Sequence, residues 1–137
     1  MSGFVLDNSV TMAWCFPEEA TPRTESLLKR ASAYETLHVP VLWEYEVINV
    51  LMLAVLRGRL LQERADIFIH DLQRFDIRRD IPDRERVFAD LQATVRKHRL
   101  TAYDAAYLEL ATRLQLPLAT LDKDLIKAAQ ATGIDLL

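Results

Sequence analysis

Four carboxylate side chains are the residues of this sequence best suited to do chemistry: Asp7, Glu46, Asp104 and Asp122. If they converge, they form a ligand set of oxygens alone, which hard divalent cations such as Mg²⁺ and Mn²⁺ prefer and which zinc usually does not. Four carboxylates would not all stay ionised in one pocket without cations, because like charges raise one another's pKa. Such a site suits phosphoryl chemistry, since bound ions orient a phosphate and generate hydroxide from water.

Three of these acids have an ordinary structural role open to them. Asp7 follows the apolar run 4–6 and Asp122 follows the apolar run 118–121, so each can cap the next helix, a contribution of about 1 kcal/mol. Asp104 is the last residue of Thr101-Ala102-Tyr103-Asp104, which resembles a capping box although Glu or Gln is usual at that position. Capping and chemistry both stay open for these three residues.

Glu46 has no capping role, because it falls inside the long apolar helix expected over residues 42–57. No Lys or Arg stands three or four positions away to neutralise it. A buried carboxylate without a partner is so costly that it becomes protonated, finds a partner from another element or coordinates a cation. Exposure to solvent beside Glu44 is the plain alternative. Asn49 lies one turn later, and Ser9 and Thr120 can supply neutral hydroxyls to the same region.

The elements that must position these acids alternate along the whole chain. Strands are expected at 4–6, 37–39, 76–81, 116–121 and 134–137, and helices follow the first strand and cover 21–33, 42–57, 61–75, 83–98, 101–114 and 122–132. The helix over 42–57 is expected to be largely buried, and Ile67, Leu72 and Phe75 are expected to reach the core. This alternation predicts a parallel sheet covered by helices on both faces. Ligands of such sheets bind at the carboxyl ends of strands, where Asp7 and Asp122 would lie.

Composition and charge set the class of protein. The chain has 137 residues, of which 50% are hydrophobic, and a net charge of −3, so we expect one globular domain over residues 1–137. It holds one cysteine, no signal-peptide pattern at its start and no apolar stretch long enough to span a bilayer, which predicts a soluble, cytoplasmic protein. Its three histidines are expected at the surface or an interface.

The charge is divided unevenly along the chain. Residues 57–99 contain 11 of the 17 basic residues but only 8 of the 20 acidic ones. A basic rim beside an acidic pocket would suit an anionic substrate. Solvated helices that carry many charges explain the same pattern, and this second interpretation is slightly favoured.

Four blocks of sequence, in this order, resemble the PIN-domain family and, within it, the VapC-type toxin ribonucleases of prokaryotic toxin–antitoxin pairs. They are VLDNSV at 5–10, Pro40 with EVINVL at 46–51, LTAYDAAYLELA at 100–111 and LPLATLDKDL at 116–125. The third block is quite specific, and the four together extend the resemblance over essentially the whole chain.

The resemblance implies a PIN-like three-layer α/β/α fold with a central, mostly parallel sheet of about five short strands. It also implies metal-dependent endonucleolytic cleavage of RNA, a homodimer and inhibition by a cognate VapB-like antitoxin whose tail crosses the acidic pocket. The family's acidic quartet falls on the four acids named above, with Asp7 and Asp104 as the main ligands of Mg²⁺ or Mn²⁺. Thr120 matches the hydroxyl residue before the last acid, and either Asp122 or Asp124 can be the fourth ligand.

A non-catalytic PIN-like module that binds RNA or a protein partner is the alternative function. The intact quartet favours the nuclease. Transfer, ribosomal and messenger RNA all stay open as substrates, as does the choice between one and two metal ions.

Overall fold

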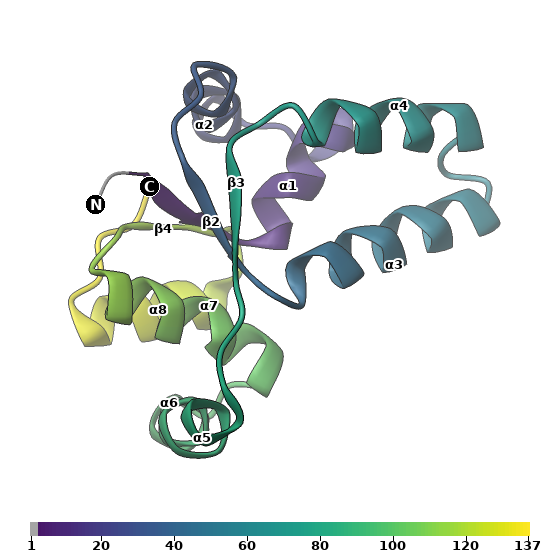
Figure 1. Ribbon diagram of the computed structural model, residues 1–137. Coiled ribbons are helices and arrows are strands. Elements are labelled where there is room, and N and C mark those ends of the chain that lie inside the picture. Colours follow the sequence, from purple (N-terminus) through teal and green to yellow (C-terminus); the bar gives the residue numbers. More distant parts are fainter. Residues whose placement is uncertain (1–2) are drawn as a thin grey trace.

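The computed structural model describes residues 3–137, and a parallel sheet lies at the centre of this part of the chain (Figure 1). Its strands are β1 (Phe4–Leu6), β2 (Leu37–Pro40), β3 (Ile77–Asp80) and β4 (Leu118–Ala119). Their order is β3-β2-β1-β4, and all three pairings are parallel. The α/β class and the parallel sheet are therefore confirmed, with β1 in the interior.

The number of strands is slightly lower than expected. Within residues 3–137 the sheet has four strands, and the segment 134–137 contributes only an isolated bridge between Leu118 and Leu136. Leu118 donates its backbone N–H to Asp135 at 2.8 Å and accepts from Leu137 at 3.1 Å. Because β4 is only two residues long, the last segment has too little backbone to pair with for a full ladder.

Helices cover both faces of the sheet. They are α1 (Asn8–Cys15), α2 (Pro22–Ser32), α3 (Trp43–Leu56), α4 (Gln62–Leu72), α5 (Arg84–Arg86), α6 (Gln92–His98), α7 (Ala102–Leu114) and α8 (Lys123–Thr132). Two short turns complete the order: the 3₁₀ turn η1 (Pro17–Glu19) and the π turn η2 (Val87–Leu91). Figure 1 shows α1 and α2 on one side of the sheet and α7 and α8 on the other. The π turn divides the single helix expected over 83–98.

Local signals in the sequence explain where several helices begin and end. Thr21 caps α2, with its side chain accepting from the Thr24 backbone and the Thr24 side chain accepting in return. Thr101 caps α7 by accepting from the backbone N–H of Asp104. Gly133 ends α8 in the left-handed conformation that glycine adopts without strain. Thr21 and Thr101 thus fix where α2 and α7 begin, and Gly133 fixes where α8 ends.

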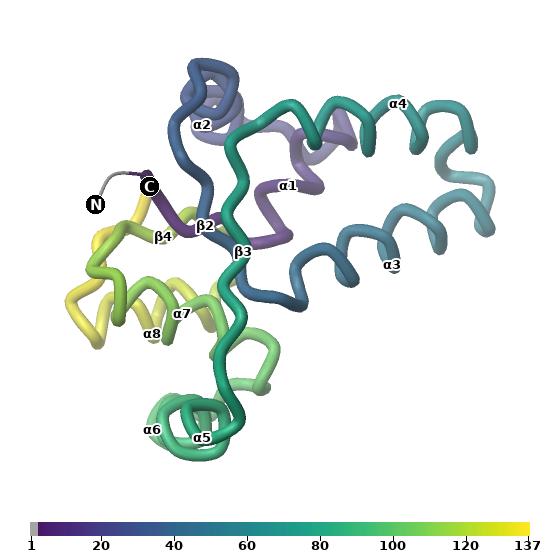
Figure 2. The backbone as a smooth tube through the Cα atoms, viewed as in Figure 1, coloured from purple at the N-terminus to yellow at the C-terminus, as the bar shows by residue number. Residues whose placement is uncertain are grey.

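The α3–α4 hairpin extends away from the sheet (Figure 2), and this placement corrects two expectations. Only one side of α3 is buried, through Trp43, Val47, Leu51 and Ala54, so the helix is not largely buried. On α4, Leu72 reaches the core but Ile67 is exposed. A hairpin beyond the sheet edge has neighbours on one side only, and hydropathy alone does not reveal this.

The remaining expectations concern histidine and membranes. His38 is buried within β2, not at the surface, while His70 is exposed and His98 lies close to the Thr132 hydroxyl, 3.3 Å away. Of the helices in residues 3–137, none combines the length and the hydropathy that a bilayer crossing requires.

Candidate active site

The four predicted acids lie where strands end and helices begin. Asp7 directly follows β1, and Asp122 lies three residues beyond β4 at the start of α8. Glu46 is in the first turns of α3, and Asp104 is in the first turn of α7. The side chains are close enough to interact electrostatically, since the charge of Asp122 raises the pKa of both Asp7 and Asp104. The sheet therefore brings together residues that are up to 115 positions apart.

Asp7 is the most enclosed of the four, with 6% of its surface exposed. Its Oδ2 accepts hydrogen bonds from the Ser9 hydroxyl at 2.6 Å and from the Thr120 hydroxyl at 2.7 Å. Within residues 3–137 its side chain makes no capping hydrogen bond to α1, so the ordinary structural role proposed for it is not fulfilled. Burial raises the pKa of Asp7, while the two hydroxyls lower it. The carboxylate is thus held in place by neutral donors.

The two hydroxyls are themselves fixed by the segment that leads into α8. The Leu121 backbone donates to Ser9 Oγ at 2.9 Å, and the Asp122 backbone donates to Thr120 Oγ1 at 3.0 Å. On the other side of this segment, Arg23 donates to the Thr120 carbonyl at 2.7 Å. Ser9 and Thr120 therefore join the loop after β1 to the loop after β4, as supporting residues around Asp7.

Glu46 has a partner that the sequence did not indicate. The hydroxyl of Tyr107, a fully buried residue of α7, donates a hydrogen bond to Glu46 Oε1. Burial raises the pKa of Glu46, and the charges of Asp7 and Asp104 raise it further, while the bond from Tyr107 lowers it. Glu46 is thus the half-buried acid whose partner comes from another element, and Glu44 instead pairs with Arg79 at 2.7 Å.

Asp104 and Asp122 differ in how far capping explains them. The Asp122 Oδ1 accepts from the Leu125 backbone at 2.9 Å, so this residue does cap α8. At the start of α7 the cap is Thr101, whose side chain accepts from the Asp104 backbone N–H at 3.1 Å and also lowers the pKa of the Asp104 carboxyl. Burial and the charges of Asp122 and Asp7 raise the pKa of Asp104.

Asp124 and Asn49 are the two further site residues that the sequence suggested. Asp124 is exposed and influences the pKa of Asp104 only weakly, whereas Asp122 influences both Asp7 and Asp104, which favours Asp122 as the fourth acid. Asn49 is exposed on α3, and no hydrogen bond joins its side chain to the quartet in the described part of the chain. A supporting role for Asn49 stays a prediction.

Comparison with known proteins identifies the family of this chain. The sequence matches the PIN domain family over residues 4–131, a range that contains all four acids. The chain belongs to the PIN-domain family. Ribonuclease VapC3 of Pyrobaculum aerophilum is 34% identical over 121 residues, which cover 88% of this chain and 90% of that protein. The resemblance to VapC-type PIN proteins is thereby confirmed.

Solved structures share the fold of this PIN domain. The crystal structure of PAE2754 from Pyrobaculum aerophilum superposes with a TM-score of 0.73 at 23% identity, covering 98% of this chain and 83% of that one. FitAcB from Neisseria gonorrhoeae gives a TM-score of 0.64 at 15% identity, with 98% and 96% covered. At these identities the likeness supports the three-layer architecture.

The donor set of this PIN domain fits a hard divalent cation. The four acids supply only oxygens, and mutual repulsion contributes to the raised pKa of Asp7, Glu46 and Asp104, which a bound cation would relieve. In the observed side-chain arrangement, no three His, Cys, Asp or Glu residues of 3–137 lie close enough together to hold one ion. The carboxylates thus surround one region of the sheet edge without meeting at a point.

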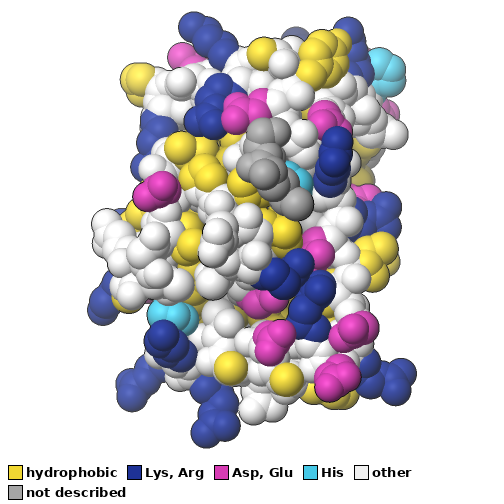
Figure 3. Space-filling view, turned by 60° about the vertical axis from the view of Figure 1, so that its left-hand side comes forward, with side chains coloured by type: hydrophobic (Ala, Val, Ile, Leu, Met, Phe, Trp, Pro, Cys, Tyr) yellow, Lys and Arg dark blue, Asp and Glu magenta, His cyan; other side chains and the backbone are white. Residues whose placement is uncertain are grey.

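Four of the 11 basic residues of the segment 57–99 pair with acids, namely Arg59, Arg78, Arg79 and Arg86. Arg59 contacts Glu18 and Glu19, each at 2.7 Å, and Arg86 lies 3.1 Å from Asp80. The face in Figure 3 shows Lys and Arg side chains interspersed with Asp and Glu. On this face the mixture of charges agrees with solvated helices that carry many charges.

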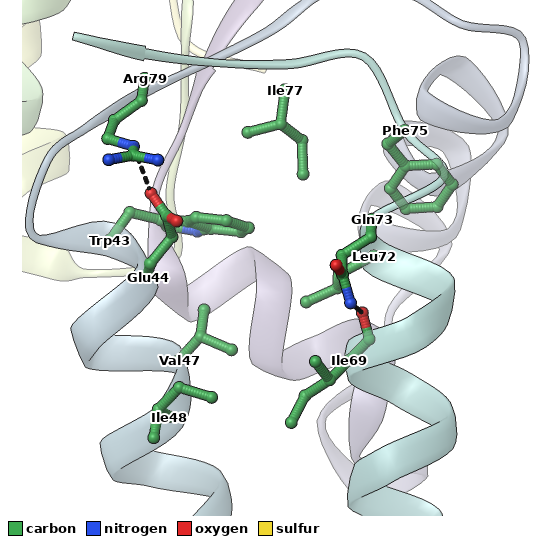
Figure 4. A pocket seen from close by; sticks show the side chains of 10 residues that line it. All are labelled: Trp43, Glu44, Val47, Ile48, Ile69, Leu72, Gln73, Phe75, Ile77 and Arg79. Carbon is green, nitrogen blue, oxygen red and sulfur yellow. Dashed lines mark hydrogen bonds and ion pairs between the residues drawn. The ribbon is translucent and has the colours of Figure 1, made fainter.

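A groove on the hairpin side is lined by residues other than the four acids. It has a volume of about 500 Å³ and lies between α3 and α4, with Val47 and Ile48 facing Ile69 and Leu72 (Figure 4). Trp43 closes its inner end and donates its indole N–H to Thr11 at 3.0 Å. The same helix α3 therefore supplies an acid to the quartet and apolar side chains to the groove.

Proposed function

We propose that this PIN domain is a metal-dependent endoribonuclease, the toxin of a toxin–antitoxin pair, which hydrolyses RNA phosphodiester bonds with water activated at the acidic quartet. The observation that carries the proposal is the buried Asp7, held by two hydroxyls at the carboxyl end of β1 and coupled electrostatically to Asp122. Membership of the PIN family and the similarity to a protein named as a ribonuclease support it.

The four acids and the two hydroxyl residues beside Asp7 would have different roles in this reaction. Asp7 and Asp104 would be the main ligands of Mg²⁺ or Mn²⁺, with Glu46 and Asp122 completing the set. The ion would orient the scissile phosphate and lower the pKa of water. Ser9 and Thr120 hold the Asp7 carboxylate in one orientation through their bonds to Oδ2. Enclosure of Asp7 by the sheet excludes bulk water from one side of the site.

The partners belong to the same proposal. We infer a cognate VapB-like antitoxin whose tail covers the acidic pocket, a homodimer, and a cytoplasmic single domain over residues 1–137. Blocking a pocket that carries several carboxylates would require a segment with positive charge. RNA is negatively charged and would enter the same pocket only when cations neutralise the carboxylates. Antitoxin and RNA would therefore bind at the same place and exclude one another.

Cleavage of a mixed RNA panel by the purified chain with Mn²⁺ tests the activity. We expect cleavage that disappears with EDTA and falls at least about 100-fold in Asp104→Asn, because a main ligand is lost. Asp90→Asn, which removes the same charge from an exposed position on η2, should cleave like the unaltered chain. Activity that survives in Asp104→Asn would contradict the assignment of the site.

The second arm of the test separates the nuclease from a binding module. Expression of the chain without antitoxin should arrest growth, and Asp7→Asn should restore it. If Asp7→Asn leaves both toxicity and RNA binding unchanged, the non-catalytic module becomes the better description.

A further inference from the structure

Tyr107 places a phenolic hydroxyl next to the acidic quartet from inside the core. The residue is among the largest fully buried side chains, and it lies on α7, three positions after Asp104. Its hydroxyl donates to Glu46 Oε1 on α3. This hydrogen bond thus links the start of α3 to α7.

The Glu46 carboxylate has fewer side-chain donors in the described part of the chain than the Asp7 carboxylate, which has two. Asp7 has two hydroxyl donors and Asp122 caps a helix, whereas the hydrogen bond that the structure gives the Glu46 carboxylate comes from Tyr107. Glu46 also lies on α3, whose hairpin extends beyond the sheet (Figure 2). Without a fixed donor, a glutamate side chain on such a helix can rotate among several rotamers.

Asp104 and Tyr107 are three positions apart on α7. Residues three apart on a helix lie on the same face, one turn from each other. A single face of α7 therefore presents both the Asp104 carboxylate and the hydroxyl that holds Glu46. Burial also raises the pKa of the Tyr107 hydroxyl above its ordinary value.

We propose that Tyr107 is a positioning residue of the metal-dependent reaction, whose hydroxyl holds the Glu46 carboxylate in the orientation that the metal ion requires. The inference rests on the proposed function of the quartet. Tyr107 has no exposed surface, so it acts through Glu46 and does not touch RNA. A tyrosine that served only to fill the core would leave metal affinity unchanged when its hydroxyl is removed.

The test is Mn²⁺ binding to the full chain, followed by electron paramagnetic resonance, in Tyr107→Phe. We expect the Mn²⁺ dissociation constant to rise about 10- to 100-fold, the range typical of removing a residue that orients a metal ligand. RNA cleavage at saturating Mn²⁺ should lose kcat and keep KM. Tyr103→Phe is the matched control, because it removes the same hydroxyl from an exposed residue one turn earlier on α7 and should change neither quantity.

A double substitution decides whether Tyr107 acts through Glu46. In Glu46→Gln, the further change Tyr107→Phe should add little loss, since coupled residues are not additive. Full additivity, or unchanged Mn²⁺ affinity in Tyr107→Phe while Glu46→Gln loses it, would overturn the inference and leave the proposed nuclease intact. If Glu46→Gln itself keeps full affinity and cleavage, the function assigned to the quartet fails instead.

A measurement without substitution of Tyr107 guards against a folding defect. In a chain carrying Tyr45→Phe and Tyr103→Phe, the exposed tyrosines next to Glu46 and Asp104 are gone. Addition of Mg²⁺ should then give an ultraviolet difference spectrum in the tyrosine band, because the charge around the Tyr107 hydroxyl changes. A flat difference spectrum at saturating Mg²⁺ would count against the inference.

Discussion

At the scale of single residues, the acid at the end of β1 shows how a carboxylate is kept ready for a cation. Asp7 is buried, which raises its pKa, and two hydroxyls that donate to the same oxygen offset part of this cost. Hydroxyl donors orient a carboxylate without neutralising it, unlike Lys or Arg. The negative charge therefore stays available to a metal ion, which a salt bridge would have removed.

Thr120→Val isolates one of these donors, since valine has nearly the same shape. We expect cleavage to fall by about tenfold and the acid limb of its pH profile to move to higher pH. The sign follows from the hydrogen bond, which lowers the pKa of Asp7 and is lost in the variant. Thr94→Val, the same change on α6, should leave the profile in place. An unshifted profile in Thr120→Val would mean that this hydroxyl does not tune Asp7.

At the scale of elements, the starts of α3, α7 and α8 deliver acids from distant parts of the chain to one edge of the sheet. The hairpin α3–α4 is held near its turn by Arg59, which pairs with Glu18 and Glu19 and stacks on the Phe16 ring at 3.9 Å. This contact ties the far end of the hairpin to η1. The near end is tied by Trp43 and Thr11.

Arg59→Ala should loosen the hairpin without unfolding the sheet. We expect faster amide hydrogen exchange over residues 53–65 and only a small fall in Tm, because exposed ion pairs contribute little. Arg64→Ala, an exposed arginine on α4, is the control. Exchange that is equally slow in both variants would show that Arg59 does not restrain the hairpin.

The sequence predicted the order of elements and the acids at strand ends, because hydropathy alternation and capping residues are local signals. The sequence did not predict the contact of Tyr107 with Glu46. A tyrosine within an apolar helical stretch indicates core packing, and its partner is 61 residues away. The expectations that Ile67 reaches the core and that His38 lies at the surface were wrong for the same reason. Both depend on which elements lie beside these residues. Local pattern predicts an element, while only the fold determines its neighbours.

At the scale of the whole molecule, the PIN domain gathers unfavourable negative charge at one edge of its sheet. Asp7, Glu46 and Asp104 each have a raised pKa, with burial as the largest cause. The folded, metal-free chain therefore keeps protons on these carboxyl groups at pH values where the unfolded chain, which releases them near pH 4, has already lost them. The stability from these groups is present below their ordinary pKa and is lost as the pH rises through the raised values. Stability of the site and readiness for a cation are thus opposed.

Asp7→Asn should accordingly stabilise the metal-free chain at pH 7.5, because it removes a buried charge and keeps an oxygen that accepts from Ser9 and Thr120. We expect a gain on the order of 1 kcal/mol, or about 3 °C in Tm, measured by thermal unfolding in EDTA. The gain should shrink at pH 4, because the raised pKa of Asp7 lets its carboxyl in the unaltered chain take up a proton at higher pH than an ordinary aspartate. Saturating Mn²⁺ should reverse the ranking, since bound metal stabilises only the chain that retains the ligand. If Asp7→Asn is the less stable chain at both pH values in EDTA, the site carries no such electrostatic strain.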